Sequence, residues 1–155
     1  MSTPITGIHH AAVNVSDWDR SVAFYRDVLG FELIFQDGSA SGRELDQNTK
    51  LANVQLRFGM VRAGETLFEL IQYEHPSPGP NDGSINDTGR THLCFRVADI
   101  EAAYAELSER GVRFNGRPLH IDSGPLAGCA FAYFPDPDGV LLEIFEDNRQ
   151  RAGAS

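Results

Sequence analysis

The sequence lacks the features of a membrane protein, a secreted protein or a disulfide framework. Its two cysteines, Cys94 and Cys129, fit no CxxC metal pattern, so two reduced thiols are expected, with a single disulfide as the alternative. No apolar run approaches the roughly 20 residues that a membrane helix needs. The opening residues MSTPITG contain no basic segment followed by an apolar one, so no signal peptide is expected. These absences predict a cytoplasmic protein.

Basic residues are also scarce. The chain has 13 Lys and Arg residues against 22 Asp and Glu, which gives a formal net charge of −9. This charge argues against nucleic acids and anionic membrane surfaces as partners. The chain has 155 residues, of which 41% are hydrophobic and 23% are charged. These values are typical of one globular domain, or of two small modules that share a core.

Two segments of the chain resemble each other. The first is HAAVNVSDWDRSVAFYRDVLGFEL from His10, and the second is HLCFRVADIEAAYAELSERGVRF from His92. In both, Val follows the His after five positions and Asp after seven, and a helix-like pattern then runs to a Gly. The offsets differ by one residue inside the helix. Such internal similarity indicates a duplicated structural unit.

Each copy predicts a strand and then a helix. Asp99 can cap the second helix, and either Ser16 or Asp17 can cap the first. Gly30 and Gly111 stand where helices commonly end. Strand-like runs follow each helix, so each half is expected to be strand–helix–strand–strand–strand. These runs are FELIFQ, NVQLRFGMV and TLFELIQY in the first half, and FNGRPLHI, CAFAYF and VLLEIFE in the second.

The expected organisation is one structural domain made of two modules. The first module spans residues 5–75, a linker spans 76–90, the second module spans 91–147, and a flexible tail spans 148–155. The linker is rich in Pro, Gly, Asn and Asp. It is interpreted as a crossover loop, with closure of part of it over a ligand as the alternative.

Strand periodicity separates the two adjacent histidines, because neighbouring strand residues point to opposite faces. The face of His10 continues through Ala12 and Asn14, whereas the face of His9 is otherwise apolar and should pack under a helix. In the second copy, His92 shares its face with Cys94 and Arg96. His10, and not His9, therefore matches His92.

Two glutamates stand in apolar strand segments, Glu69 in LFELI and Glu143 in LLEIF. A carboxylate in such a place is costly unless it is paired or bound to metal. Taken singly, a strand histidine is usually structural and a strand glutamate usually faces solvent. Together, two histidines and two carboxylates at matched positions suit a divalent ion such as Zn, Ni, Co, Fe or Mn. The remaining histidines, His9, His75 and His120, are interpreted as structural, with a place at the rim of the cleft as the alternative for His120.

The segments IHHAAVNVSDWDRSVAFYRDVLGFEL, LFELIQY, THLCFRVADIEAAYAELSERGVRF and YFPDPDGVLLEIFE resemble the vicinal oxygen chelate superfamily of glyoxalases, epimerases, dioxygenases and bleomycin-resistance proteins. The resemblance covers about residues 5–147. It implies an α+β fold of two βαβββ modules that form an open, curved mixed-sheet cleft around one metal ion. It also implies His10, Glu69, His92 and Glu143 as the ligands.

The resemblance implies a metal-dependent lyase, isomerase or epimerase of the glyoxalase type. Such an enzyme would act through an enolate on a small oxygen-rich, thioester or thiohemiacetal substrate, with Glu143 as first choice for the base and Glu69 as second. Methylmalonyl-CoA epimerases are similar, but they usually have Gln at the position of Glu69. They also have a carboxylate base where a rough alignment places Gln55.

Two other functions stay open. The triad His10, His92 and Glu143 would serve an iron-dependent dioxygenase, with Glu69 surplus. A non-catalytic binding or resistance protein is disfavoured, because such members generally lack the ligands. A homodimer is compatible with the family. Candidate substrate contacts are Arg96, for which a structural ion pair is the alternative, and the wall residues Asn14, Phe58 and Tyr133.

Overall fold

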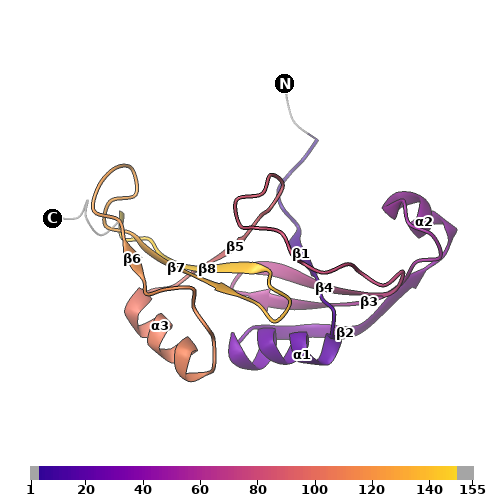
Figure 1. Cartoon of the computed structure of the whole chain (residues 1–155), viewed down its shortest axis with the longest axis horizontal. Helices are drawn as coiled ribbons and strands as arrows, with labels where there is room; N and C mark the ends of the chain where they lie inside the picture. The colour runs from indigo at the N-terminus through magenta and orange to yellow at the C-terminus, as the bar shows by residue number, and fades with distance from the viewer. Residues whose placement is uncertain (1–3, 150–155) are drawn as a thin grey trace. The chain divides into compact units, whose positions relative to one another are not determined.

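The computed structural model describes residues 4–149, and the chain divides after Pro80 into two compact units (Figure 1). Each unit is built around its own four-stranded sheet. The flexible tail expected at residues 148–155 lies outside the described residues from position 150 onward.

The first unit has the strand order β1-β4-β3-β2. Strand β1 runs parallel to β4, and the remaining pairs are antiparallel. Its elements are β1 (His10–Asn14), α1 (Trp18–Ala23), the π-helical turn η1 (Phe24–Val28), β2 (Glu32–Ser41), α2 (Arg43–Thr49), β3 (Gln55–Ala63) and β4 (Thr66–His75).

The second unit repeats this topology in the order β5-β8-β7-β6, with β5 parallel to β8. The expected fold class, α+β with two βαβββ modules and mixed sheets, is confirmed. The elements are β5 (Leu93–Arg96), α3 (Ile100–Glu109), β6 (Leu119–His120), β7 (Ala130–Pro135) and β8 (Leu141–Glu146).

The predicted helix signals are present in both units. The Asp17 side chain accepts a hydrogen bond from the Arg20 backbone N–H at 3.0 Å, and Asp99 accepts one from Ala102 at 2.9 Å. Gly111 follows α3 with a φ of 95°, a conformation that favours glycine. None of the helices within residues 4–149 has the length and hydropathy needed to cross a bilayer.

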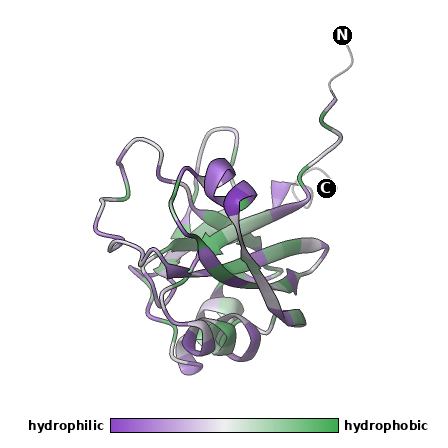
Figure 2. Cartoon of the chain, turned by 90° about the vertical axis from the view of Figure 1, so that its right-hand side faces the viewer, coloured by the Kyte–Doolittle hydropathy of each residue, from purple (hydrophilic) through white to green (hydrophobic). Residues whose placement is uncertain are grey.

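Two elements differ from the sequence-based expectation. Helix α2 has no buried residue and is coloured hydrophilic in Figure 2, so it lacks the apolar stripe by which a helix is predicted. The Asp46 carboxylate fastens it by accepting hydrogen bonds from the backbone of Asn53 and Val54. Strand β6 is much shorter than the predicted run FNGRPLHI, because Gly and Pro within that run disfavour a strand.

In each unit, apolar residues fill one face of the sheet. In the first unit Tyr25 is fully buried, and its ring centroid lies 5.1 Å from that of Phe68. In the second, Ile100 of α3 and Phe134 of β7 are buried. The helices therefore cover one face of each sheet.

Truncation of Phe68 is expected to destabilise the chain strongly. Phe68 is 2% exposed, so Phe68→Ala leaves a cavity and should lower the free energy of unfolding by about 3–5 kcal/mol. Ile8, which is 90% exposed, is the matched control. Ile8→Ala should change the free energy of unfolding by less than about 0.5 kcal/mol. Urea denaturation measures both. A loss below about 1 kcal/mol for Phe68→Ala would contradict this packing.

Candidate functional site

The predicted alternation of faces is present in β1 and β5. His10, Ala12 and Asn14 are exposed, whereas Val13 between them is buried. His92 immediately precedes β5, where Cys94 and Arg96 are exposed. Both histidines therefore lie on the sheet face that the helices leave open.

In the first unit, His10 lies against Glu69. Their Nε2 and Oε2 atoms are 3.3 Å apart, and the Glu69 side chain is 17% exposed. Glu69 is paired in register with Ala12 of β1 and with Met60 of β3. Neither of these neighbouring side chains carries a hydrogen-bond donor. We call His10 and Glu69 the first pair.

In the second unit, His92 lies against Glu143, with 2.9 Å between Nε2 and Oε2. Glu143 is more enclosed than Glu69, since its side chain is 8% exposed. Its register partners are Cys94 of β5 and Tyr133 of β7. The Tyr133 ring also packs edge-on against His92, with 5.4 Å between centroids. We call His92 and Glu143 the second pair.

The surroundings of the second pair raise the pKa values of Cys94 and Tyr133, the two residues paired with Glu143 in the sheet. Burial, the Glu143 charge and a hydrogen bond to that carboxylate raise the pKa of the Cys94 thiol to about 12. Burial, followed by the Glu143 charge, also raises the pKa of the Tyr133 hydroxyl. Cys94 and Tyr133 are therefore neutral groups with a proton to donate at neutral pH.

His9 contacts the first pair, although its sequence position suggested a structural role. Its Nδ1 atom lies 2.8 Å from Nδ1 of His10, so both nitrogens of the His10 ring face another polar side chain. Such a contact orients an imidazole. Alternation could not have indicated it, because His9 precedes β1. The one indication in the sequence was that His9 stands directly next to His10.

The other histidines lie elsewhere. His75 Nδ1 is 2.9 Å from the Asn53 carbonyl oxygen, and His120 Nε2 is 3.0 Å from a carboxylate oxygen of Glu101 on α3. Each therefore has a hydrogen-bonding partner outside the His–Glu pair of its own unit. The structure thus agrees with the interpretation of His75 and His120 as structural.

Arg96 and the three candidate wall residues, Asn14, Phe58 and Tyr133, all fall within strands. Asn14 is exposed at the opposite end of β1 from His10, on the same face, and Phe58 lies two residues before Met60 on the face of Glu69, packed against Phe35 with 5.8 Å between ring centroids. Arg96 is exposed and makes no ion pair within residues 4–149, so the alternative role considered for it is not observed. Tyr133 contacts His92 through its ring edge.

The donor atoms of the two pairs suit a divalent ion. Each pair presents an imidazole nitrogen and a carboxylate oxygen within 3.3 Å of each other. Nitrogen and oxygen ligands of this kind are those that Zn, Ni, Co, Fe and Mn accept. Within the described part of the chain, no group of three or more His, Cys, Asp or Glu side chains is gathered. Each pair therefore offers two ligands.

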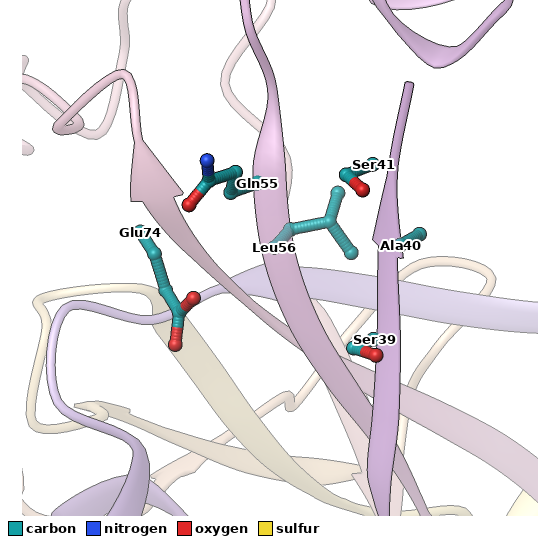
Figure 3. A pocket seen from close by; sticks show the side chains of 6 residues that line it. All are labelled: Ser39, Ala40, Ser41, Gln55, Leu56 and Glu74. Atoms are coloured by element: carbon teal, nitrogen blue, oxygen red, sulfur yellow. The ribbon is translucent and has the colours of Figure 1, made fainter.

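A cavity of about 480 Å³ lies in the first unit, near the ends of β2, β3 and β4 (Figure 3). Glu74 is five residues beyond Glu69 on β4, a separation of roughly 16 Å along a strand. The cavity includes none of the predicted site residues. Its lining consists of Ser39, Ala40, Ser41, Gln55, Leu56 and Glu74.

Comparisons with known proteins agree with this architecture. The model of the Glyoxalase/Bleomycin resistance protein/Dioxygenase superfamily matches residues 7–144. A 2-epi-5-epi-valiolone epimerase from Actinomyces sp is 38% identical over 144 residues, which cover 88% of this chain and 77% of the epimerase.

A lactoylglutathione lyase from Haemophilus influenzae is 28% identical, over 94% of this chain and 96% of the lyase. Among solved structures, a glyoxalase family protein from Bacillus cereus superposes with a TM-score of 0.75 at 17% identity, over 94% of this chain and 96% of that protein. This last similarity concerns the fold alone.

Proposed function

The chain belongs to the Glyoxalase/Bleomycin resistance protein/Dioxygenase superfamily, and from this membership we propose that it is a divalent-metal-dependent lyase, isomerase or epimerase. Its substrate is a small oxygen-rich, thioester or thiohemiacetal molecule. The observation that carries the proposal is the repetition of one His–carboxylate pair in each module. The named relatives, an epimerase and a lyase, support the reaction class.

The proposed ligands are His10 and Glu69 of the first pair and His92 and Glu143 of the second. Two imidazoles and two carboxylates suit Ni, Co, Zn, Mn or Fe. When bound, the ion polarises a substrate carbonyl and stabilises negative charge on its oxygen. The two negative charges of the carboxylates balance the two positive charges of the ion, which favours retention of that ion.

Proton transfer is the step that these side chains perform. A C–H bond next to the substrate carbonyl breaks, its proton passes to a carboxylate oxygen of Glu69 or Glu143, and the electron pair moves onto the carbonyl oxygen as an enolate. Return of the proton to the opposite face of the same carbon gives epimerisation. Return to a different carbon gives isomerisation.

Substrate contacts come from the same open faces. Arg96 is placed to meet an anionic substrate group, because it is exposed and makes no ion pair in the described residues. Asn14, exposed at the other end of β1 from His10, can donate or accept a hydrogen bond. Phe58 and Tyr133 supply aromatic surface near Glu69 and Glu143 respectively.

Solvent hydrogen exchange tests this function even when the product has not been identified. The metal-loaded chain is incubated in D₂O with 2-epi-5-epi-valiolone, 2-oxoaldehyde–thiol adducts and acyl-CoA epimers, and NMR follows deuterium at the carbon next to the carbonyl. We expect exchange in one of these compounds, and we expect a chelator to abolish it. Exchange that persists after metal removal, or its absence from every compound, would count against the proposal.

A further inference from the structure

A row of four side chains crosses the second sheet, whose strands are labelled in Figure 1. The strand register pairs Arg96 of β5 with Phe145 of β8. It also pairs Phe145 with Phe131 of β7, and Phe131 with Leu119 of β6. Because directly paired strand residues point to the same face of a sheet, one cation and three apolar side chains follow one another across this face. We call Arg96, Phe145, Phe131 and Leu119 the Arg96 row.

The Arg96 row lies beside the second pair. The next row along the strands consists of Cys94, Glu143 and Tyr133, each two positions from a member of the Arg96 row. Residues two apart on a strand share a face, at a separation of roughly 7 Å. The Phe131 and Tyr133 rings also contact each other, with 5.2 Å between their centroids. One small molecule can therefore reach both rows.

The Arg96 row faces away from the helix and is open to solvent. His120, the neighbour of Leu119 on β6, points to the other face, where it contacts Glu101 of α3. Leu119 is 53% exposed, Arg96 is exposed, and the two phenylalanines of the row are half-buried. These side chains are therefore available to a ligand.

The chemistry of the row changes from one end to the other. Arg96 makes no hydrogen bond or ion pair within residues 4–149, so its guanidinium is free to pair with a carboxylate. The other three members offer only apolar surface. Since neighbouring strands lie about 4.8 Å apart, Phe131 is roughly 10 Å from β5. A ligand that fits has a negative charge at one end and an elongated apolar body.

The matched row of the first module lacks this pattern. Asn14 is paired with Ile71, Ile71 with Phe58, and Phe58 with Gly38. Asn14 follows His10 by four positions, as Arg96 follows His92, so an uncharged amide stands where the second module has the guanidinium. A Cβ atom at Gly38 would lie 2.7 Å from the Phe58 ring, so that ring already fills the far end of the row. The combination of a free cation and open apolar surface belongs to the second module.

We propose that the Arg96 row determines substrate specificity by binding a carboxylate at Arg96 and an aryl or alkyl body across Phe145, Phe131 and Leu119. This inference rests on the proposed function and narrows its substrate to an amphipathic acid. The reacting carbonyl of such a substrate reaches the neighbouring row, which contains Glu143. The apolar side chains of the row gain from the removal of their surface from water.

Binding of 4-phenylbutyrate to the full chain tests the charged end of the row. This probe joins a carboxylate to an aromatic ring through a three-carbon chain, and calorimetry measures its affinity. Arg96→Gln should weaken its binding at least about tenfold, because a hydrogen bond to a charged group is lost. The uncharged 4-phenylbutan-1-ol should bind the unchanged chain at least about tenfold more weakly than the acid, and Arg96→Gln should alter its affinity by less than about twofold.

Two further variants test the apolar end. Leu119→Ser is compatible with folding because Leu119 is 53% exposed, and it should weaken 4-phenylbutyrate binding at least about threefold. Phe131→Leu removes the ring but keeps an apolar side chain, and it should weaken binding by a similar factor. Arg43→Gln and Leu51→Ser are the matched controls, since they change an exposed arginine and a 42% exposed leucine of the first module. Both should stay within about twofold of the unchanged chain.

A chelator in the same titration separates this inference from the proposed function. We expect 4-phenylbutyrate to bind within about twofold as tightly with the chelator as without it, because the row itself holds the probe. If the chelator abolishes binding, the carboxylate meets the metal and not Arg96, so the inference is wrong while the proposed function stands. Equal affinities of Arg96→Gln and Arg43→Gln, or no binding to the unchanged chain, would also overturn it.

Discussion

The double variant His10→Ala/His92→Ala is expected to bind divalent metal at least about 10³-fold more weakly than the unchanged chain. Each substitution removes one imidazole nitrogen and leaves its carboxylate partner, Glu69 or Glu143, in place. Residues that merely orient a ligand contribute about 10- to 100-fold in affinity, so the loss of two direct ligands should exceed that. Calorimetric titration with Ni²⁺ or Co²⁺ measures the change.

His75→Ala/His120→Ala is the matched control for this experiment. It also removes two imidazoles, but His75 contacts the Asn53 carbonyl and His120 contacts Glu101, so neither belongs to a His–Glu pair of the candidate site. Its affinity should stay within about twofold of the unchanged chain. Equal losses in the two double variants would show that the chain binds metal non-specifically through surface histidines.

Glu69→Gln is expected to lower the rate of substrate proton exchange by about 10³-fold while the chain still binds metal. The amide preserves size and one oxygen ligand but cannot accept the proton, and general-base catalysis contributes about 10²- to 10⁴-fold. Exchange in D₂O, followed by NMR on whichever compound exchanges with the unchanged chain, gives the rate. Metal content measured on the same sample shows whether the site is intact.

Glu74→Gln is the control on the same strand. Glu74 is exposed and lines the cavity of Figure 3, five residues from Glu69. Glu74→Gln should leave the exchange rate within about twofold of that of the unchanged chain. If Glu69→Gln retained more than about a tenth of the rate, Glu69 would not be the group that carries the proton.

Much of the arrangement could be predicted because it depends on local periodicity. Alternation along β1 placed His10 on the face shared with Ala12 and Asn14, and all three residues are exposed in the structure. The same argument placed His92 with Cys94 and Arg96. The sequence predicted Asp99 as the cap of the second helix and either Ser16 or Asp17 as the cap of the first, and the structure has Asp99 and Asp17 in these roles.

The rest depends on contacts between distant parts of the chain, which periodicity does not contain. Periodicity gives no sign that Tyr133 stands opposite Glu143, since this follows from the register of β7 with β8. The position of Cys94 beside Glu143 likewise follows from the pairing of β5 with β8. Helix α2 was missed because it buries no residue and is held by Asp46 instead.

The central claim is that His10, Glu69, His92 and Glu143 bind one divalent ion, and elemental analysis tests it most directly. The chain is purified without chelator and its metal content is compared with that of His10→Ala/His92→Ala. The account predicts about one equivalent of Ni, Co, Zn or Mn per chain, lost in the double variant. Stoichiometric iron would favour the dioxygenase instead. No metal, even after reconstitution, would contradict the account.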